Sequence, residues 1–334
     1  MGDSTMDARR FPAAGRKVSP IGFGSWAIGA DWGEVDERDA LATLNEALDR
    51  GVDFIDTADV YGDGRAEKLI AKALKARAGK PAPMVATKAG RRLRPHVADG
   101  YNHDNLAAFV ERSLKFLEVD RLDLVQLHCP PTEVYYRPET FEALGRLVEQ
   151  GKIGHWGVSV EKVEEGIKAL EFPGLASVQI IYSIFRQRPA ELFFDMAKRR
   201  DVAIIVRVPL ASGMLSGKYR RDSQFPASDH RNYNRHGEAF DVGETFSGVP
   251  YEEGLAAVEA IRALVPPGAT MAQLALRWIL MNEAVSVVIP GAKNPRQARE
   301  NVEAAALPPI PAEAMRQIAA IYDSRIKPFV HQRW

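Results

Sequence analysis

The strongest constraint on the fold is the segment at residues 52–62, a short apolar run that ends in a carboxylate and is followed by a tyrosine. Its β-prone residues predict a strand over residues 52–56, with Asp56 at its end. The polar residues after Asp56 predict a loop that returns Tyr61 to the same end of the strand. We therefore expect Asp56 and Tyr61 to face one cavity.

Two further apolar runs end in a side chain that is rarely buried alone. Residues 84–88 stop at Lys88, and residues 122–128 stop at His128. A buried lysine or aspartate needs a partner, so charged groups at successive strand ends call for an explanation. If the strands are parallel in a closed barrel, their carboxyl ends share one rim, where barrel enzymes place their chemistry. Asp56, Tyr61, Lys88 and His128 are then expected to meet there.

Strand and helix patterns alternate along most of the chain. The expected strands are residues 21–26, 52–56, 84–88, 122–128, 153–159, 177–181, 203–207 and 285–289, each with a helical pattern within reach. This alternation predicts an α/β fold, a (β/α)8 TIM barrel, with a hairpin within residues 9–30 that plugs the barrel floor. We expect one domain over residues 1–334, with its core at about 18–305 and a tail at 306–334.

The charge composition gives no indication of a nucleic-acid or membrane partner. Lys+Arg and Asp+Glu number 44 each, so no overall field favours nucleic acid or an anionic membrane. Cys129 is the single cysteine, which fits a reducing compartment, and no apolar run reaches the roughly 18 residues of a spanning helix. We expect a cytoplasmic protein, a monomer by default. Residues 219–250 are polar and aperiodic, and are predicted to be a lid or a disordered insertion.

The four rim residues suit proton transfer to an oxygen that gains negative charge. Lys88 beside Tyr61 would stabilise a phenolate, Asp56 would hold the ammonium, and His128 would donate to or orient a substrate oxygen. No ligand motif such as His-Glu-x-x-His is present, so we expect no metal. The competing interpretation is a structural ion pair with an incidental tyrosine and histidine.

The combined pattern resembles the aldo-keto reductase superfamily. The resemblance rests on Phe54-Ile55-Asp56-Thr57-Ala58-x-x-Tyr61-Gly62, Lys88, Gln126-Leu127-His128 and Gly157-Val158-Ser159, and it extends from about residue 18 to 305. The run Arg207-Val208-Pro209-Leu210 is similar to the bacterial NADPH-dependent branch of that superfamily. The resemblance implies reduction of aldehydes and ketones with a nicotinamide cofactor. Tyr61 would then be the acid, Lys88 and Asp56 would tune it, and His128 would position the carbonyl.

The resemblance also implies where NADPH would bind, since no strand-linked Gly-x-Gly-x-x-Gly indicates a Rossmann domain. It places the carboxamide at Ser159 and Gln179, the ring against Arg207, and the pyrophosphate along the run from Pro209 to Lys218. The full set of expected cofactor residues is Gly24, Ser25, Trp26, Ser159, Gln179, Arg207, Pro209, Leu210, Ser212, Gly213, Lys218, Gly291, Lys293, Gln297 and Asn301.

Two points of this cofactor assignment stay open. Many relatives carry Ser-Asn where this chain has Ser159-Val160, which removes one carboxamide contact. Lys293 beside the start of a helix favours the 2'-phosphate, hence NADPH over NADH, although a solvated loop lysine is the alternative.

The sequence thus predicts an NADPH-dependent oxidoreductase acting on a small-molecule carbonyl. A regulatory protein on the same fold, like the potassium-channel beta subunits, and a sugar or polyol dehydrogenase working oxidatively are the alternatives. Specificity is expected in residues 131–137, in residues 219–250 and in the tail, which either folds over the mouth or is disordered. Trp26, Trp32, Trp156, Tyr135 and Tyr136 are candidates for pocket lining or for ordinary packing.

Overall fold

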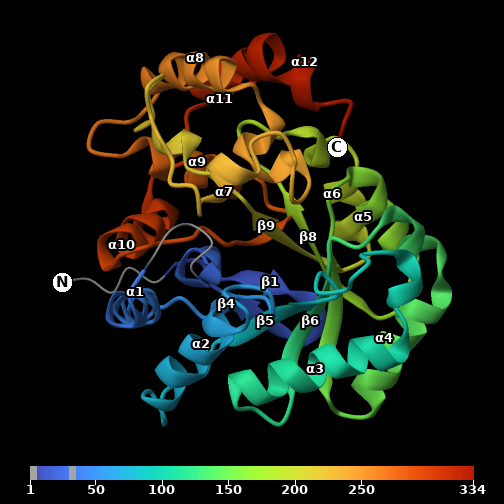
Figure 1. Ribbon diagram of the computed structural model, residues 1–334. Helices are drawn as coiled ribbons and strands as arrows, with labels where there is room; N and C mark the ends of the chain where they lie inside the picture. Colours follow the sequence, from blue (N-terminus) through green and yellow to red (C-terminus); the bar gives the residue numbers. More distant parts are fainter. Residues whose placement is uncertain (1–5, 30–34) are drawn as a thin grey trace.

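The computed structural model describes residues 6–29 and 35–334, and within them one sheet contains eight parallel strands (Figure 1). The strands are β3 Phe23–Gly24, β4 Phe54–Asp56, β5 Met84–Ala89, β6 Leu122–His128, β7 Ile153–Ser159, β8 Leu175–Ile181, β9 Ala203–Arg207 and β10 Val285–Val288. Each strand pairs with the next one along the chain. Parallel bridges from Ile21 to Val288 and from Gly24 to Gly291 join the first strand to the last, so the sheet closes into the expected barrel.

Gly24 is required for this closure because the two end strands approach closely. A Cβ at this position would lie 2.6 Å from the backbone oxygen of Ile289, well inside contact distance. The Gly24 amide instead donates to the Pro290 carbonyl at 3.1 Å. A glycine therefore permits the backbone contact that joins β3 to the chain after β10.

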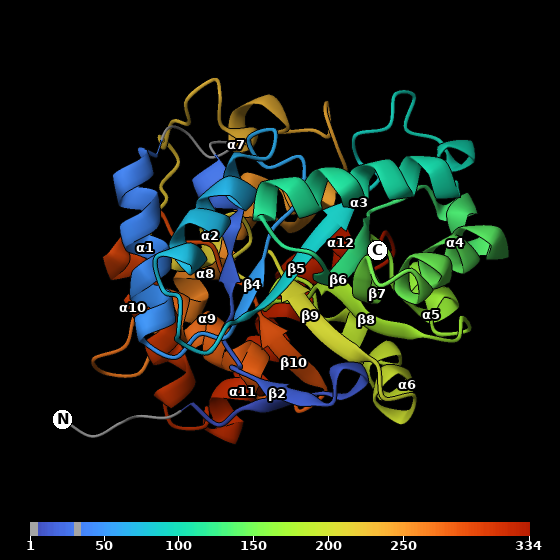
Figure 2. The same cartoon turned by 90° about the horizontal axis from the view of Figure 1, so that it is seen from below.

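Helices surround the barrel, as Figure 2 shows from below. They are α1 Glu37–Asp49, α2 Arg65–Lys75, α3 His103–Leu117, α4 Pro138–Glu149, α5 Val163–Ala169, α6 Phe193–Arg199, α9 Met271–Leu280 and α10 Pro295–Glu303. Several begin at a side chain that caps the first turn, among them Asp36, Asn102, Thr270 and Asn294. The TIM-barrel prediction is therefore confirmed.

The N-terminal hairpin covers the floor of the barrel. It consists of β1 Arg9–Phe11 and β2 Arg16–Val18, which pair antiparallel. Phe11 packs on Phe54 with ring centroids 5.9 Å apart, and both belong to a small apolar cluster that also contains Met84. Because Phe54 and Met84 are the first residues of β4 and β5, the hairpin lies at the amino ends of the strands. The opposite, carboxyl-end rim is left open for chemistry.

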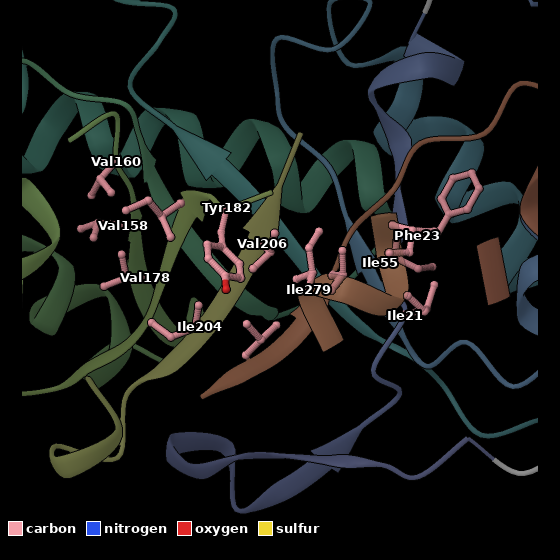
Figure 3. Packing of buried hydrophobic residues seen from close by; sticks show 14 of the residues in the cluster. Ile21, Phe23, Ile55, Val158, Val160, Val178, Tyr182, Ile204, Val206 and Ile279 are labelled. Carbon is pink, nitrogen blue, oxygen red and sulfur yellow. The ribbon is translucent and has the colours of Figure 1, made fainter. Parts of the chain in front are cut away.

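The larger apolar cluster lies between the sheet and its helices. Figure 3 shows Val158, Val178, Ile204 and Val206 on neighbouring strands, and all four are buried. Trp156 and Tyr135 belong to this cluster, whereas Tyr136 is 69% exposed, so these three aromatic residues are packing or surface residues. Trp32 lies outside the described residues.

The polar segment at residues 219–250 is packed rather than extended. It contains α7 His230–Tyr233 and the short 3-10 turns η7 Val242–Glu244 and η8 Phe246–Gly248. Buried Asn234 organises it: its side-chain oxygen accepts from the amides of Ala239 and Phe240, and its amide group donates to Thr245. The segment follows β9 and reaches the carboxyl-end rim, as a lid is expected to do.

The tail is ordered and holds the polar segment from outside. Helix α8 Tyr251–Arg262 directly follows the polar segment. The tail itself forms α11 Ala312–Ile321, the π-helical turn η10 Tyr322–Ile326 and α12 Lys327–Val330. The terminal Trp334 is 4% exposed, and its indole Nε1 donates to Asp241 at 2.9 Å. The guanidinium of Arg186 lies 4.1 Å from the centroid of the Trp334 ring. The tail thus packs against the polar segment and Arg186, and none of the residues that line the cavity within the described structure belongs to it.

No helix within the described residues is both long enough and apolar enough to cross a membrane.

Replacing Trp334 by alanine is expected to lower the free energy of unfolding by about 3 kcal/mol, because a buried aromatic ring and its hydrogen bond are lost. Chemical denaturation monitored by circular dichroism measures the change. Phe329→Ala, at a side chain that is 37% exposed in the same tail, is the control and should change stability by less than about 1 kcal/mol. Equal effects of the two substitutions would show that Trp334 is not an anchor.

Candidate active site

Three strand ends and one loop bring the predicted tetrad together. Lys88 Nζ donates to Asp56 Oδ2 at 2.6 Å and to the Thr57 carbonyl at 2.8 Å, and it lies 3.2 Å from the Tyr61 hydroxyl. The Lys88 and Asp56 side chains are 1% and 3% exposed. Parallel neighbours β4, β5 and β6 place Asp56, Lys88 and His128 on one rim, as expected from their positions at the strand ends.

The loop that carries Tyr61 depends on a glycine at the next position. Gly62 has a φ of +58°, and a Cβ there would lie 2.0 Å from the carbonyl oxygen of Gly29. Only glycine fits both the left-handed backbone and this close approach. The turn returns the Tyr61 ring to the rim, where it stacks on Trp26 with centroids 6.0 Å apart.

Asp56 uses its second carboxylate oxygen for a neighbouring amide. Gln179 Nε2 donates to Asp56 Oδ1 at 2.7 Å, and the Ser159 hydroxyl donates to Gln179 Oε1 at 3.4 Å. All three side chains are buried. Ser159, Gln179 and Asp56 therefore form one connected network with Lys88, and the negative charge of Asp56 is fully paired.

Burial controls the acidity of the central pair. Burial raises the pKa of Tyr61 well above its usual value, and Asp56 adds to this, while Arg91 and Arg207 oppose it. Burial also lowers the pKa of Lys88, against the opposing effect of Asp56. Lys88 was expected to make ionisation of the Tyr61 phenol easier. In the resting site the free-energy cost of burying a phenolate outweighs this effect. Tyr61 is therefore a neutral phenol that holds its proton.

His128 lies against both Tyr61 and an arginine. Its ring meets that of Tyr61 edge-on at 6.0 Å, and its Nε2 is 3.2 Å from Nη1 of Arg91. Burial lowers the pKa of His128 well below its usual value, and Arg91, Lys88 and Arg207 lower it further. The imidazole is therefore neutral.

Two arginines and two glutamates form a buried cluster beside this histidine. Arg207 contacts Glu161 at 2.8 Å and Glu244 at 3.2 Å, and Arg91 contacts Glu244 at 2.6 Å. Burial opposes ionisation of Glu244, but Arg91 and Arg207 overcome it and lower the pKa of this carboxyl. Glu244 therefore offsets part of the positive charge of the two arginines, whereas burial raises the pKa of Glu161 to about 7.

Cys129 joins Glu161 and Glu244 in a group whose potential metal-binding atoms lie within 4.8 Å of one another. The arginines already occupy the two carboxylates, and Arg207 also lies 3.6 Å from the cysteine sulfur. Burial raises the pKa of the Cys129 thiol well above its usual value, which disfavours the thiolate that a metal requires. The group is thus accounted for as part of the ion-pair cluster, with Cys129 as a small buried residue.

A cavity of about 460 Å³ runs from the tetrad across the barrel mouth. Asp56, Tyr61 and His128 line one end, whereas Lys88 lies behind them. The predicted cofactor residues that line it are Gly24, Trp26, Gln179, Arg207, Pro209, Leu210, Ser212, Gly213, Lys218, Gly291, Lys293, Gln297 and Asn301. Ser25 and Ser159 do not reach its wall: both are fully buried, and Ser159 lies behind Gln179.

The cavity wall combines unusual backbone with positive charge. Val208, Ala211 and Ser212, in the segment after β9, have φ values of 50°, 48° and 55°, in a left-handed region that L-residues rarely adopt. Such strain is concentrated at ligand sites. Lys218, Arg231, Lys293 and Arg296 also line the cavity, and their charges lie close enough to one another to interact. Helix α10 begins beside it, and Asn294 caps its first turn.

Sequence reasoning missed several residues of this site. Glu244, Arg231, Thr270 and Arg296 line the cavity, and Arg91 contacts His128 from the loop after β5. Glu244 and Arg231 lie inside the expected lid, but no local pattern distinguishes them from its other charged residues. Arg91 follows the Lys88 strand end by three positions, and that proximity was the one available signal.

Asp56→Asn is expected to lower the free energy of unfolding by about 3 kcal/mol, because the buried Lys88 ammonium then lacks its counter-charge. Denaturant titration measures this loss. The double substitution Asp56→Asn with Lys88→Met should recover most of the stability, since no unpaired charge remains. A double variant as unstable as the sum of the two single variants would exclude this coupling.

The comparisons with known proteins agree with this geometry. The profile of the aldo/keto reductase family matches residues 20–323. Aldo-keto reductase YhdN of Bacillus subtilis is 32% identical over 289 residues, which cover 85% of this chain and 84% of that protein. A probable voltage-gated potassium channel subunit beta of Arabidopsis thaliana is 28% identical and covers 91% and 93% of the two chains.

Solved structures share the fold over almost the whole chain. The glycerol dehydrogenase AKR11B4 of Gluconobacter oxydans superposes with a TM-score of 0.77 at 27% identity, covering 98% of this chain and 97% of that one. An aldo-keto reductase of Klebsiella pneumoniae in complex with NADPH has a TM-score of 0.69 over 96% and 99%, but at 22% identity it shows the fold alone. With the family profile spanning most of the sequence and the expected tetrad assembled at the barrel rim, this chain belongs to the aldo/keto reductase family.

Proposed function

We propose that this protein is an NADPH-dependent oxidoreductase that reduces the carbonyl group of a small aldehyde or ketone to an alcohol. One observation carries the proposal: Tyr61, whose hydroxyl is 3.2 Å from the Lys88 ammonium, lines a cavity of about 460 Å³ that is also lined by Lys218, Arg231, Lys293 and Arg296. A proton donor and an elongated anion-binding groove are the two things that hydride reduction by a phosphorylated dinucleotide requires.

The described residues fit such a cofactor. Gln179 and Arg207 line the tetrad end, where they would face the nicotinamide, and Ser212, Gly213 and Lys218 would surround the pyrophosphate. Lys293, Gln297 and Asn301 line the far end and would contact the adenosine. The Asn301 side chain donates to the Gly291 carbonyl at 3.2 Å, which shapes the backbone at this end. Ser159 would act by holding Gln179 and not by direct contact.

Tyr61, Lys88 and Asp56 then have distinct tasks. A bound nicotinamide supplies the hydride that the carbonyl carbon accepts. Tyr61, neutral because of its raised pKa, supplies the proton to the carbonyl oxygen. The ammonium of Lys88 stabilises the phenolate that this leaves behind, and Asp56 keeps the ammonium charged and in place. The reverse sequence would oxidise an alcohol, since the same groups serve both directions.

Two other functions remain as competitors. Oxidation of a polyol is favoured by the likeness to a glycerol dehydrogenase, and it uses the same groups in reverse. A regulatory role is favoured by the likeness to a probable channel subunit. The tetrad supports catalysis over regulation, because the Tyr61 phenol, beside the paired Lys88 ammonium, lines the cavity where a substrate oxygen could reach it.

Tyr61→Phe is expected to lower kcat for carbonyl-dependent NADPH oxidation at least about 100-fold, because only the proton donor is removed. The ring and its stacking on Trp26 remain, so the dissociation constant for NADPH should change less than about threefold. Steady-state kinetics with aromatic aldehydes, dicarbonyls and keto-sugars, together with fluorescence titration, measures both quantities. Undiminished turnover in the variant would eliminate Tyr61 as the acid.

Lys293→Ala is expected to weaken NADPH binding about 10-fold and to leave NADH binding nearly unchanged, because the ammonium would face the 2'-phosphate that only NADPH carries. Burial lowers the pKa of Lys293, and the nearby positive charges of Arg231 and Lys218 lower it further, so a phosphate would meet three basic side chains here. Fluorescence titration with each dinucleotide gives the two dissociation constants. A variant that keeps the wild-type preference would mean that another group selects the cofactor.

A further inference from the structure

The loop that carries Tyr61 contains a buried carboxyl group that the proposed reduction does not use. It belongs to Asp59, two positions before Tyr61, and its side chain is fully buried. Neither of its oxygens has a hydrogen-bond partner among the residues that the structure describes. Glu67, in the first turn of α2, is also fully buried, and its Oε1 accepts from the Thr87 hydroxyl at 2.7 Å.

Ionisation of Asp59 is unfavourable in these surroundings. A buried carboxylate without a donor loses its hydration and gains no hydrogen bond, so such a group keeps its proton. Burial raises the pKa of Asp59 to about 7, the negative charge of Glu67 adds to this, and Arg92 and Arg112 oppose it. Tyr101, before α3, is the other titratable neighbour: burial raises the pKa of its phenol, and the charge of Asp59 contributes.

The Tyr61 loop is held on both sides of the tyrosine by one arginine. Arg112 Nη1 donates to the Asp59 carbonyl at 2.9 Å, and its Nη2 donates to the Asp63 carbonyl at 3.0 Å. Tyr61 stands between these contacts, with its hydroxyl 3.2 Å from Lys88 Nζ. A shift of the backbone at Asp59 therefore changes the distance between the phenol and the ammonium.

An ionised Asp59 would be repelled from one side and attracted from the other. Glu67 of α2 would repel it, whereas Arg112 of α3 and Arg92 of the loop after β5 would attract it. Glu67 is fixed in a helix and by its hydrogen bond to Thr87, so the loop is the element that yields. A carboxylate that turns from Glu67 toward the arginines would carry the loop with it.

We propose that the proton on Asp59 positions Tyr61 for catalysis: the neutral carboxyl group keeps the Tyr61 hydroxyl at Lys88, and loss of the proton withdraws it. This role rests on the proposed carbonyl reduction. Asp59 is not among the described residues that line the cavity, so it acts through the loop and not on the substrate. The proton that reaches the substrate oxygen still comes from Tyr61, and the Asp59 proton exchanges with solvent.

The same proton links stability to pH. Folded Asp59 keeps its proton up to about pH 7, whereas an aspartate in the unfolded chain loses it at about pH 4. The folded protein therefore binds more protons between these values. The stability that Asp59 contributes is complete below about pH 4 and is lost as the pH rises to about 7. Asp59→Asn should remove this dependence.

The test measures kcat between about pH 6 and about pH 8 in the full chain, with NADPH and 4-nitrobenzaldehyde as probes. Wild-type kcat is expected to fall about 10-fold across this range, with a midpoint near pH 7, because only the protonated form is active. Asp59→Asn should keep its pH 6 value throughout, since an amide stays neutral. Asp63→Asn is the matched control: it makes the same change in the same loop, at a side chain that is 74% exposed, and should keep the wild-type profile.

Two further variants separate Asp59 from other groups. Burial also raises the pKa of Glu161 to about 7, so Glu161 is the rival source of a transition. Glu161→Gln, normalised to its own kcat at pH 6, should keep the transition. Glu67→Gln should move the midpoint to lower pH, because it removes the repulsion that helps Asp59 to hold its proton. This shift decides if Asp59→Asn fails to fold, as judged by circular dichroism and NADPH binding.

Infrared spectroscopy detects the proton without turnover. The wild type should show a component of the carboxylic-acid C=O band that disappears near pH 7 and that Asp59→Asn lacks. Absence of this component, a kcat transition that survives in Asp59→Asn, an unmoved midpoint in Glu67→Gln, or loss of the transition in Glu161→Gln would overturn the inference. A wild-type protein that shows the expected infrared titration but reduces no carbonyl at any pH would instead refute the proposed function.

Discussion

The buried contact between Lys88 and Asp56 is the interaction on which the site depends. The Lys88 ammonium lies 2.6 Å from the Asp56 carboxylate, and both side chains are almost fully buried. Each charge requires the other, because an unpaired ion at this position would cost several kcal/mol. Parallel pairing of β4 with β5 fixes the two strand ends side by side, so the pair exists only if the barrel is correctly assembled. Through this pair the fold supplies a charged group next to the Tyr61 hydroxyl.

A second group of paired charges lies on the same rim beside His128. Glu244 and Glu161 contact Arg91 and Arg207 in a buried cluster, in which burial raises the pKa of Glu161 to about 7. Burial, reinforced by the two arginines, keeps His128 neutral beside a neutral Tyr61. The carboxylates of Asp56 and Glu244 that line the cavity are each paired with a buried cation. Negative charge that develops on a substrate oxygen would meet preorganised donors, which is the condition for electrostatic stabilisation.

Strand-end residues were predictable from the sequence because their position follows from local patterns. Asp56, Lys88 and His128 each terminate an apolar run, and parallel strands must bring such ends together. The barrel and its floor hairpin followed in the same way, whereas most of the cavity lining was predicted from the resemblance to the aldo-keto reductase superfamily. The strand ending in Asp56 begins at Phe54, two residues later than expected, because the barrel pairs only three residues there.

The Arg91–Glu244 contact was not predictable, because its partners are 153 positions apart and both lie in loops. No periodicity connects such residues, and charge pairing between loops is decided by the tertiary arrangement alone. The depth of a side chain also depends on the tertiary arrangement. Ser159 and Ser25 are fully buried and do not line the cavity. Sequence position specifies which strand end a residue occupies, but not how deep its side chain lies.

The proposed reduction requires that hydride pass from a nicotinamide to a carbonyl carbon in the cavity beside Tyr61. Single-turnover reaction of the wild-type protein with NADPH deuterated at both C4 positions, followed by mass spectrometry of the product, tests it most directly. We predict an alcohol that carries one deuterium on its carbinol carbon. NADPH that binds tightly but transfers no deuterium to any member of a broad carbonyl panel would contradict this claim and favour the regulatory function.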